Sequence, residues 1–249
     1  MSKEILLIHP HDKTTKFLNR IKNHLINSYR ENIHHFNIKP RDDSHDTCLK
    51  QIIEMPPKSL IIFMGHSNTK ALFGSRSDDY EMFAMASEDA LIDNPNVVNF
   101  FNNSFITSDN IDVFNGKSVF CLSCNSKFLG KHAIERGANA FIGFGDIPAS
   151  NGELNDKGYK NVSRYLVSQM KTELNMIIKV SLAKAIKDQY DFQQLYNFIK
   201  LLINQRIGYH LIDRKRKKER FAIADYLYFL KKDITLLGDE KAPVFIKEV

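Results

Sequence analysis

The chain has 249 residues, 43% of them hydrophobic and 26% charged, a composition typical of a globular protein with a sizeable core rather than a disordered chain. No stretch reaches the roughly 18 consecutive apolar residues that a membrane helix requires, and the N-terminus lacks the apolar core and cleavage site of a signal peptide. Three cysteines do not form a disulfide framework. We therefore expect a cytoplasmic protein without a membrane partner.

Apolar runs and amphipathic segments alternate through the first two-thirds of the chain. Helical spacing predicts helices near 17–26 and 48–53 and over 128–136, the last one ended by a glycine at Gly137. Such alternation with short apolar strands indicates an α/β fold with a mostly parallel sheet covered on both faces. The predicted strands are 5–8, 36–38, 60–64, 118–122 and 139–144.

The last third of the chain has a helical pattern. Residues 156–230 are expected to form a mainly helical extension, and residues 233–239 a closing strand and turn, within a single domain over 1–249. We assign the helical part to packing and partner surface, with Tyr226, Tyr228 and Phe229 in its core. The segment between Phe73 and Asp112 has no clear period and is a candidate for a site-forming loop.

Two predicted strands end in reactive side chains. The strand 60–64 leads into Gly65-His66-Ser67, and the strand 118–122 leads into Ser123-Cys124-Asn125. If these strands are parallel neighbours, His66 and Cys124 project from the edge of the sheet where α/β proteins bind ligands. A thiolate at Cys124, favoured by the following helix N-terminus, with His66 as acid/base, suits nucleophilic catalysis. The backbone N–H groups of Ser67 and Cys124 would then stabilise the oxyanion.

These segments carry a family resemblance. Leu60-Ile61-Ile62-Phe63-Met64-Gly65-His66-Ser67 and Val119-Phe120-Cys121-Leu122-Ser123-Cys124-Asn125-Ser126 resemble the two catalytic blocks of the caspase-like cysteine peptidases, especially the bacterial CHAT branch. The wider group includes caspases, separases, gingipains and clostripain-like enzymes. The histidine precedes the cysteine, as in caspases. One residue departs from the pattern: these enzymes usually have glycine after the histidine, where this chain has Ser67, whose side chain would narrow the oxyanion hole or change the backbone angle.

The resemblance implies a three-layer caspase-like fold and a cysteine endopeptidase that hydrolyses amide bonds of a protein substrate through a thioester, without metal or organic cofactor. Several relatives place an acid after the third strand to bind a basic side chain before the cleaved bond, and Asp146 stands there. Asp79 and Glu81 are weaker candidates for this task. Stand-alone members of the branch often act as effectors in bacterial defence, which implies a separate activating protein.

Other interpretations stay open. A caspase-like protein without activity, serving as an adaptor or scaffold, is the main alternative, and Ser67 supports it. Asp146 is alternatively a loop aspartate that caps local backbone. Cys121 and Cys124 form a Cys-x-x-Cys typical of redox or zinc sites, but Cys121 falls inside a strand and belongs in the core.

Charge and motifs bear on two further classes. The net charge of +6 comes largely from the run 214–220, which we interpret as a solvated helix face and a possible self-cleavage or regulatory site, so nucleic acid is not the expected partner. No glycine-rich phosphate motif follows a predicted strand, which argues against a nucleotide-binding enzyme.

Overall fold

The computed structural model describes most of the chain as an α/β fold with a six-stranded sheet and a C-terminal helical region. No helix in the described ranges is both long and apolar enough to cross a lipid bilayer. The described residues are 4–10, 15–39, 42–75, 105–148, 151–156, 158–159, 162–212 and 219–245.

The main sheet has the strand order β2-β1-β3-β6-β7-β8, in which all neighbours are parallel except β7 and β8. The four strands β1, β3, β6 and β7 are buried along their whole length, as expected for parallel strands covered on both faces. The bounds are β1 Ile5–Ile8, β2 Ile33–Phe36, β3 Leu60–Met64, β6 Ser118–Leu122, β7 Ala140–Gly143 and β8 Thr235–Gly238. A separate antiparallel pair joins β4 (Ala71–Leu72) to β5 (Ile106–Thr107).

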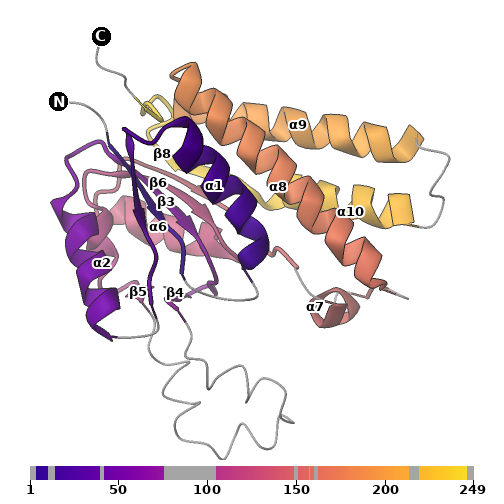
Figure 1. The fold of residues 1–249 in the computed structure, drawn as a ribbon, viewed down its shortest axis with the longest axis horizontal. Helices are drawn as coiled ribbons and strands as arrows, with labels where there is room; N and C mark the ends of the chain where they lie inside the picture. Colours follow the sequence, from indigo (N-terminus) through magenta and orange to yellow (C-terminus); the bar gives the residue numbers. More distant parts are fainter. Residues whose placement is uncertain are drawn as a thin grey trace, which may run out of the picture.

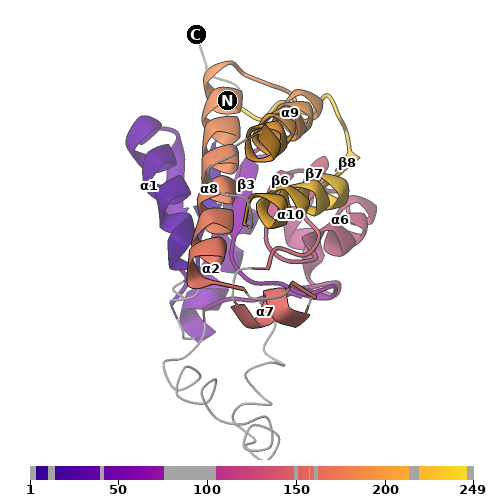
Figure 2. The same ribbon diagram turned by 90° about the vertical axis from the view of Figure 1, so that its right-hand side faces the viewer.

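Helices cover both faces of the sheet (Figures 1 and 2). One face packs against α1 and the three long C-terminal helices, and the other packs against α2, α6 and the short helix η2. Both views show α1 and α8 side by side, while α8, α9 and α10 extend together beyond the sheet. The helices are η1 Lys16–Leu18, α1 Asn19–Ser28, α2 Asp42–Glu54, η2 Ile111–Phe114, α6 Ser126–Glu135, α7 Asn151–Asp156, α8 Arg164–Lys187, α9 Phe192–Ile212 and α10 Glu219–Asp233.

The predicted elements are confirmed with three corrections. The second strand is Ile33–Phe36 rather than 36–38, because β2 is an edge strand with little burial and so lacks an apolar run. The segment 73–112 was expected to lack regular structure, but strand β5 and the start of helix η2 lie near its C-terminal end. Only Tyr226 of the expected aromatic core is buried, whereas Tyr228 and Phe229 are 49% and 47% exposed. Helix α10 therefore presents aromatic surface.

Candidate active site

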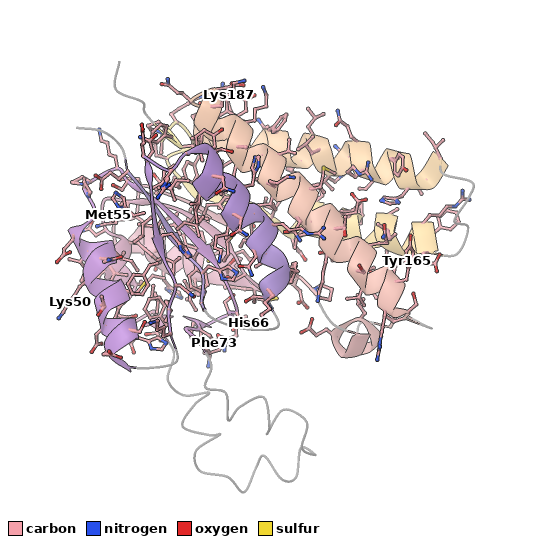
Figure 3. The ribbon with its side chains drawn as sticks, viewed as in Figure 1. Lys50, Met55, His66, Phe73, Tyr165 and Lys187 are labelled. Carbon is pink, nitrogen blue, oxygen red and sulfur yellow. The ribbon has the colours of Figure 1, made fainter. Side chains whose placement is uncertain are left out.

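His66 and Cys124 leave neighbouring parallel strands at the same edge of the sheet. Strand β3 pairs with β6 in the register that sets Met64 opposite Leu122, and the Gly65 N–H donates to the Leu122 carbonyl at 3.3 Å. Each reactive residue follows two positions after this last pair, and both side chains are half-buried. Figure 3 shows His66 at the carboxyl end of the sheet. The prediction that the two strands are parallel neighbours is confirmed.

A tight hairpin holds the backbone of His66. The His66 carbonyl accepts a hydrogen bond from the Phe73 N–H at 2.9 Å. The side-chain Oδ1 of Asn68 accepts hydrogen bonds from the N–H groups of Lys70 and Ala71, each at 2.8 Å. An asparagine that bonds the backbone just after it stabilises a turn. The turn folds the chain back toward β4, so His66 lies on a fixed loop.

Ser67 links the histidine loop to the cysteine loop. Its hydroxyl donates to the carbonyl oxygen of Cys124. Its φ is not positive, so no left-handed conformation is required where caspase-like enzymes have glycine. No described residue accepts a hydrogen bond from the Ser67 N–H. The side chain thus ties the two loops together while the N–H is left for another acceptor.

Cys124 lies on a sharp strand-to-helix turn. Asn125, directly after it, adopts the left-handed conformation with φ 58° and donates its N–H to the Gly145 carbonyl at 2.7 Å. Asparagine tolerates this conformation better than most residues. Helix α6 begins at Ser126, two residues before the predicted start at 128, so the helix N-terminus lies next to the thiol and favours its ionised form.

Ser126 connects the three segments around the turn. Its buried hydroxyl lies 2.8 Å from the Cys121 carbonyl and 2.9 Å from the Ser123 carbonyl, and it accepts from the Phe144 N–H at 3.0 Å. A hydroxyl has one donor hydrogen and two acceptor lone pairs, so it serves β6 and the end of β7 together. This bridge fixes the backbone on both sides of Cys124.

The other two cysteines have no access to solvent. Cys121 is buried within β6, as predicted, and burial raises the pKa of its thiol to about 12. Burial likewise raises the pKa of the Cys48 thiol. Among the residues that the structure describes, no group of three or more His, Cys, Asp and Glu side chains is arranged to hold a metal ion. Of the three cysteines, all of which the structure describes, Cys124 is the one whose side chain is partly exposed to solvent.

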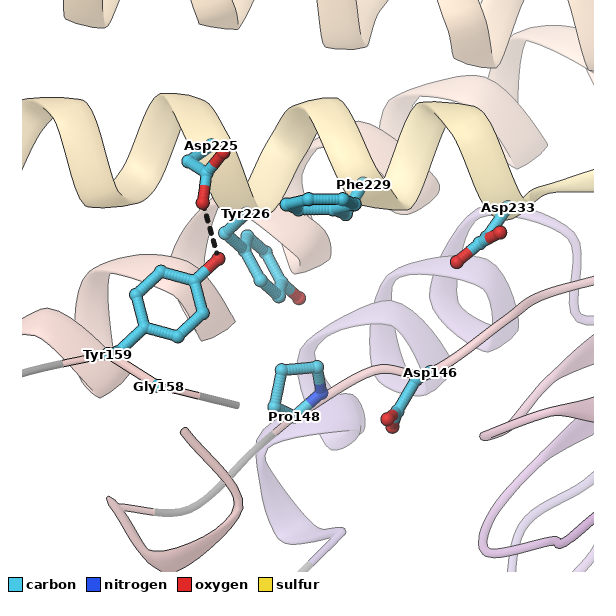
Figure 4. Close-up of a pocket in the computed structure, with 8 residues that line it drawn as sticks. All are labelled: Asp146, Pro148, Gly158, Tyr159, Asp225, Tyr226, Phe229 and Asp233. Atoms are coloured by element: carbon cyan, nitrogen blue, oxygen red, sulfur yellow. Dashed lines mark hydrogen bonds between the residues drawn. The ribbon is translucent and has the colours of Figure 1, made fainter. Parts of the chain in front are cut away.

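A cavity of about 320 Å³ with an acidic and aromatic lining lies between α10 and the residues 146–148 and 158–159 (Figure 4). The Cys124 Sγ lies 3.5 Å from the carbonyl oxygen of Ile147, the residue between Asp146 and Pro148 of the cavity wall. Asp146 is exposed and lines this cavity. Its wall also includes the side chains of Tyr159, Asp225, Tyr226, Phe229 and Asp233.

Two polar contacts join α10 to other segments beside the cavity. The hydroxyl of Tyr159, which follows α7, donates to Asp225 Oδ2 at 3.0 Å, and the ammonium of Lys127, the second residue of α6, donates to Asp233 Oδ1 at 2.8 Å. The hydroxyl of Tyr226 points into the cavity in Figure 4. Burial raises the pKa of Tyr226, and nearby ionisable groups, the Asp146 carboxylate among them, add to this shift, so this hydroxyl remains a proton donor.

Comparison with known proteins gives no relative: no protein-family model, no curated protein and no solved structure matches the chain. What the chain does must therefore be argued from its own residues.

Sequence reasoning missed the contribution of α10 to the cavity. Asp225, Phe229 and Asp233 are spaced by four residues, so they form one helix face. That spacing was the available signal, but it does not say what the face meets. Asp79, Glu81 and residues 214–218 of the basic run lie outside the described residues.

Proposed function

We propose that the chain is a cysteine endopeptidase with a caspase-like fold of the CHAT type, in which Cys124 is the nucleophile and His66 the acid/base. The observation that carries this proposal is the parallel pairing of β3 and β6, which brings both residues to the carboxyl edge of the sheet. The bond from the Ser67 hydroxyl to the Cys124 carbonyl adds support, because it holds the two loops in contact. A dyad needs this proximity for proton transfer.

The reaction follows from these roles. His66 takes the thiol proton, and the Cys124 sulfur attacks the carbonyl carbon of the scissile amide. His66 then gives the proton to the leaving amine, which departs and leaves a thioester. Water, deprotonated by His66, hydrolyses the thioester and restores the thiol. The N–H groups of Ser67 and Cys124 would stabilise the oxyanion in both steps.

The substrate residue before the cleaved bond is basic in this proposal. Among the described residues, the cavity near Cys124 is lined by three carboxylates, from Asp146, Asp225 and Asp233, of which Asp233 is paired with the Lys127 ammonium. Tyr159, Tyr226 and Phe229 add aromatic surface on which a guanidinium can stack. Carboxylates bind a guanidinium through charge-assisted, often bidentate, hydrogen bonds. An arginine or lysine side chain suits this charge and chemistry.

The proposed setting rests on the family resemblance. The resemblance supports an effector in bacterial defence that a separate protein activates, with another protein as substrate. Exposed apolar side chains on α9 and α10, among them Leu201, Ile212 and Phe221, are available to contact such an activator.

A catalytically inactive adaptor is the second candidate function. The observation that favours it is Ser67, whose hydroxyl occupies the space between the two loops and engages the carbonyl of Cys124. In an adaptor this contact would serve to hold the two loops rather than to support catalysis.

A thiol-reactive peptidyl probe separates the two functions. We would compare probes with arginine, lysine or aspartate in the leading position on wild type, Cys124→Ala and His66→Ala, with Cys121→Ala as the matched cysteine control. A peptidase loses labelling with Cys124→Ala, is impaired by His66→Ala, and keeps labelling with Cys121→Ala. Asp146→Asn should weaken labelling by basic probes selectively. Equal labelling by all three probes, or labelling that survives Cys124→Ala, would sink the assignment. Complete absence of labelling would mean either the inactive adaptor or a peptidase that still requires its activating protein.

A further inference from the structure

A second cavity, of about 280 Å³, lies between the first turns of α1 and the first half of α8. Arg20 from α1 and Arg164 and Lys171 from α8 line it together with the Ser168 side chain. None of the described residues that line it is acidic. This is the opposite of the cavity beside Cys124, whose wall carries three carboxylates.

Neither of the two arginines forms an ion pair with a residue that the structure describes, and both side chains are exposed. Arginine without an acidic partner beside a concave surface is available for an anion, which its planar group binds through two parallel hydrogen bonds.

Lys171 is fixed beside them. It is half-buried, and its ammonium lies 4.9 Å from the centre of the Phe17 ring. Burial lowers its pKa, while the negative charge of Glu153 partly opposes that shift. Three cationic side chains against Glu153 leave two positive charges at the cavity. That charge matches a phosphate monoester, which carries about −1.5 to −2 at neutral pH.

The position of the cavity adds to its positive potential. Arg20 is the second residue of α1, while the residues of α8 that line the cavity run from its first residue, Arg164, through its first three turns, so the cavity lies beside the N-terminal parts of both helices. The two helices run in parallel, since Tyr29 just after α1 bonds the Ala183 carbonyl near the end of α8. Helix α1 follows β1, so its N-terminus lies at the carboxyl edge of the sheet, where ligands bind in α/β proteins.

We infer that the cavity between α1 and α8 binds the phosphate group of a small organic phosphate ester through Arg20, Arg164 and Lys171. Ser168 lies among these residues as a further hydrogen-bonding group, and Phe17 and Val167 form an apolar wall for the organic part. The cavity is slightly smaller than the roughly 300–1,000 Å³ of typical ligand sites, which favours a small ester over a nucleotide. This inference does not depend on the proposed peptidase activity.

Calorimetric titration of the intact chain with glycerol 3-phosphate, at low and constant ionic strength, tests the inference, with glycerol as the uncharged reference. We expect saturable binding of one molecule per chain, weakened about tenfold in Arg20→Ala/Lys171→Ala because charge-assisted bonds are lost. The matched control is Lys131→Ala/Arg136→Ala, which removes the same charges from exposed positions on α6 and at the residue just after it. Circular dichroism verifies that both variants fold.

One further variant predicts a gain. Glu153→Gln removes the negative charge that acts on Lys171, so it should tighten binding severalfold. Absence of saturable binding in wild type overturns the inference. An equal loss of affinity in the control variant, or no gain of affinity with Glu153→Gln, also overturns it, because either result would mean that binding of the phosphate depends on net charge rather than on this cavity.

Discussion

Replacing Ser126 by alanine should destabilise the fold out of proportion to the single oxygen removed. The hydroxyl is fully buried at the start of α6. It accepts the Phe144 N–H at 3.0 Å and lies within hydrogen-bonding distance of the Cys121 and Ser123 carbonyls. Alanine leaves the buried Phe144 N–H without its acceptor, and water cannot reach it as a substitute.

The magnitude follows from these contacts. An unsatisfied buried N–H costs about 1–3 kcal/mol, and the lost donation to a carbonyl adds about 1 kcal/mol. The higher helix propensity of alanine returns about 0.5 kcal/mol. The net loss is about 1.5–3.5 kcal/mol. For a chain of this size that corresponds to a fall in Tm of roughly 3–14 °C.

Thermal and urea unfolding, followed by circular dichroism, measure this loss. The matched control is Ser28→Ala, at the exposed last residue of α1, where the change in unfolding free energy should stay within about 0.5 kcal/mol. If Ser126→Ala loses no more than the control, the hydroxyl does not bridge β6, α6 and β7, and the account of how Cys124 is positioned fails.

Two further results are expected. Iodoacetamide at pH 8 should modify Cys124 in the folded protein but not Cys121, because a pKa of about 12 leaves roughly one Cys121 thiol in ten thousand ionised. Peptide mass mapping identifies the modified cysteine. Modification of Cys121 without unfolding would contradict its burial. Arg206→Leu should lower the free energy of unfolding, measured in urea, by about 3 kcal/mol, because Arg206 pairs with the buried Glu173 carboxylate through two hydrogen bonds of 2.7 Å. The double variant Glu173→Leu/Arg206→Leu should recover much of this loss. If the single variant is as stable as the double variant, the reasoning is refuted.

The central part of the fold was predictable because its signals are local and strong. Four strands are continuous apolar runs, and a run buried on both faces can be recognised without knowing its neighbours. Helix α6 also carries its own stop signal, since Gly137 adopts φ 94° at its end. The edge strand β2 has no such run, because only Ile33 is buried and the rest of the strand needs no apolar side chains.

The candidate site likewise has residues that the sequence predicted and residues that only the structure revealed. His66 and Cys124 were found because each directly follows a strand that the sequence marks clearly. The acidic cavity was found only at Asp146, whereas Asp225, Phe229 and Asp233 come from a helix far along the chain. The spacing of residues shows whether a helix face is polar or apolar, but which segment that face contacts depends on how the whole helical region packs.

The sequence by itself determined the order of the elements, the mostly parallel sheet and the two reactive residues at strand ends, because these depend on hydrophobic periodicity and on the chain direction of each strand. Only the tertiary structure decided that α10 closes the cavity beside Cys124, and that α1 and α8 bring Arg20, Arg164 and Lys171 together. Such groupings come from packing between segments distant in sequence, and no local pattern encodes which surfaces will meet.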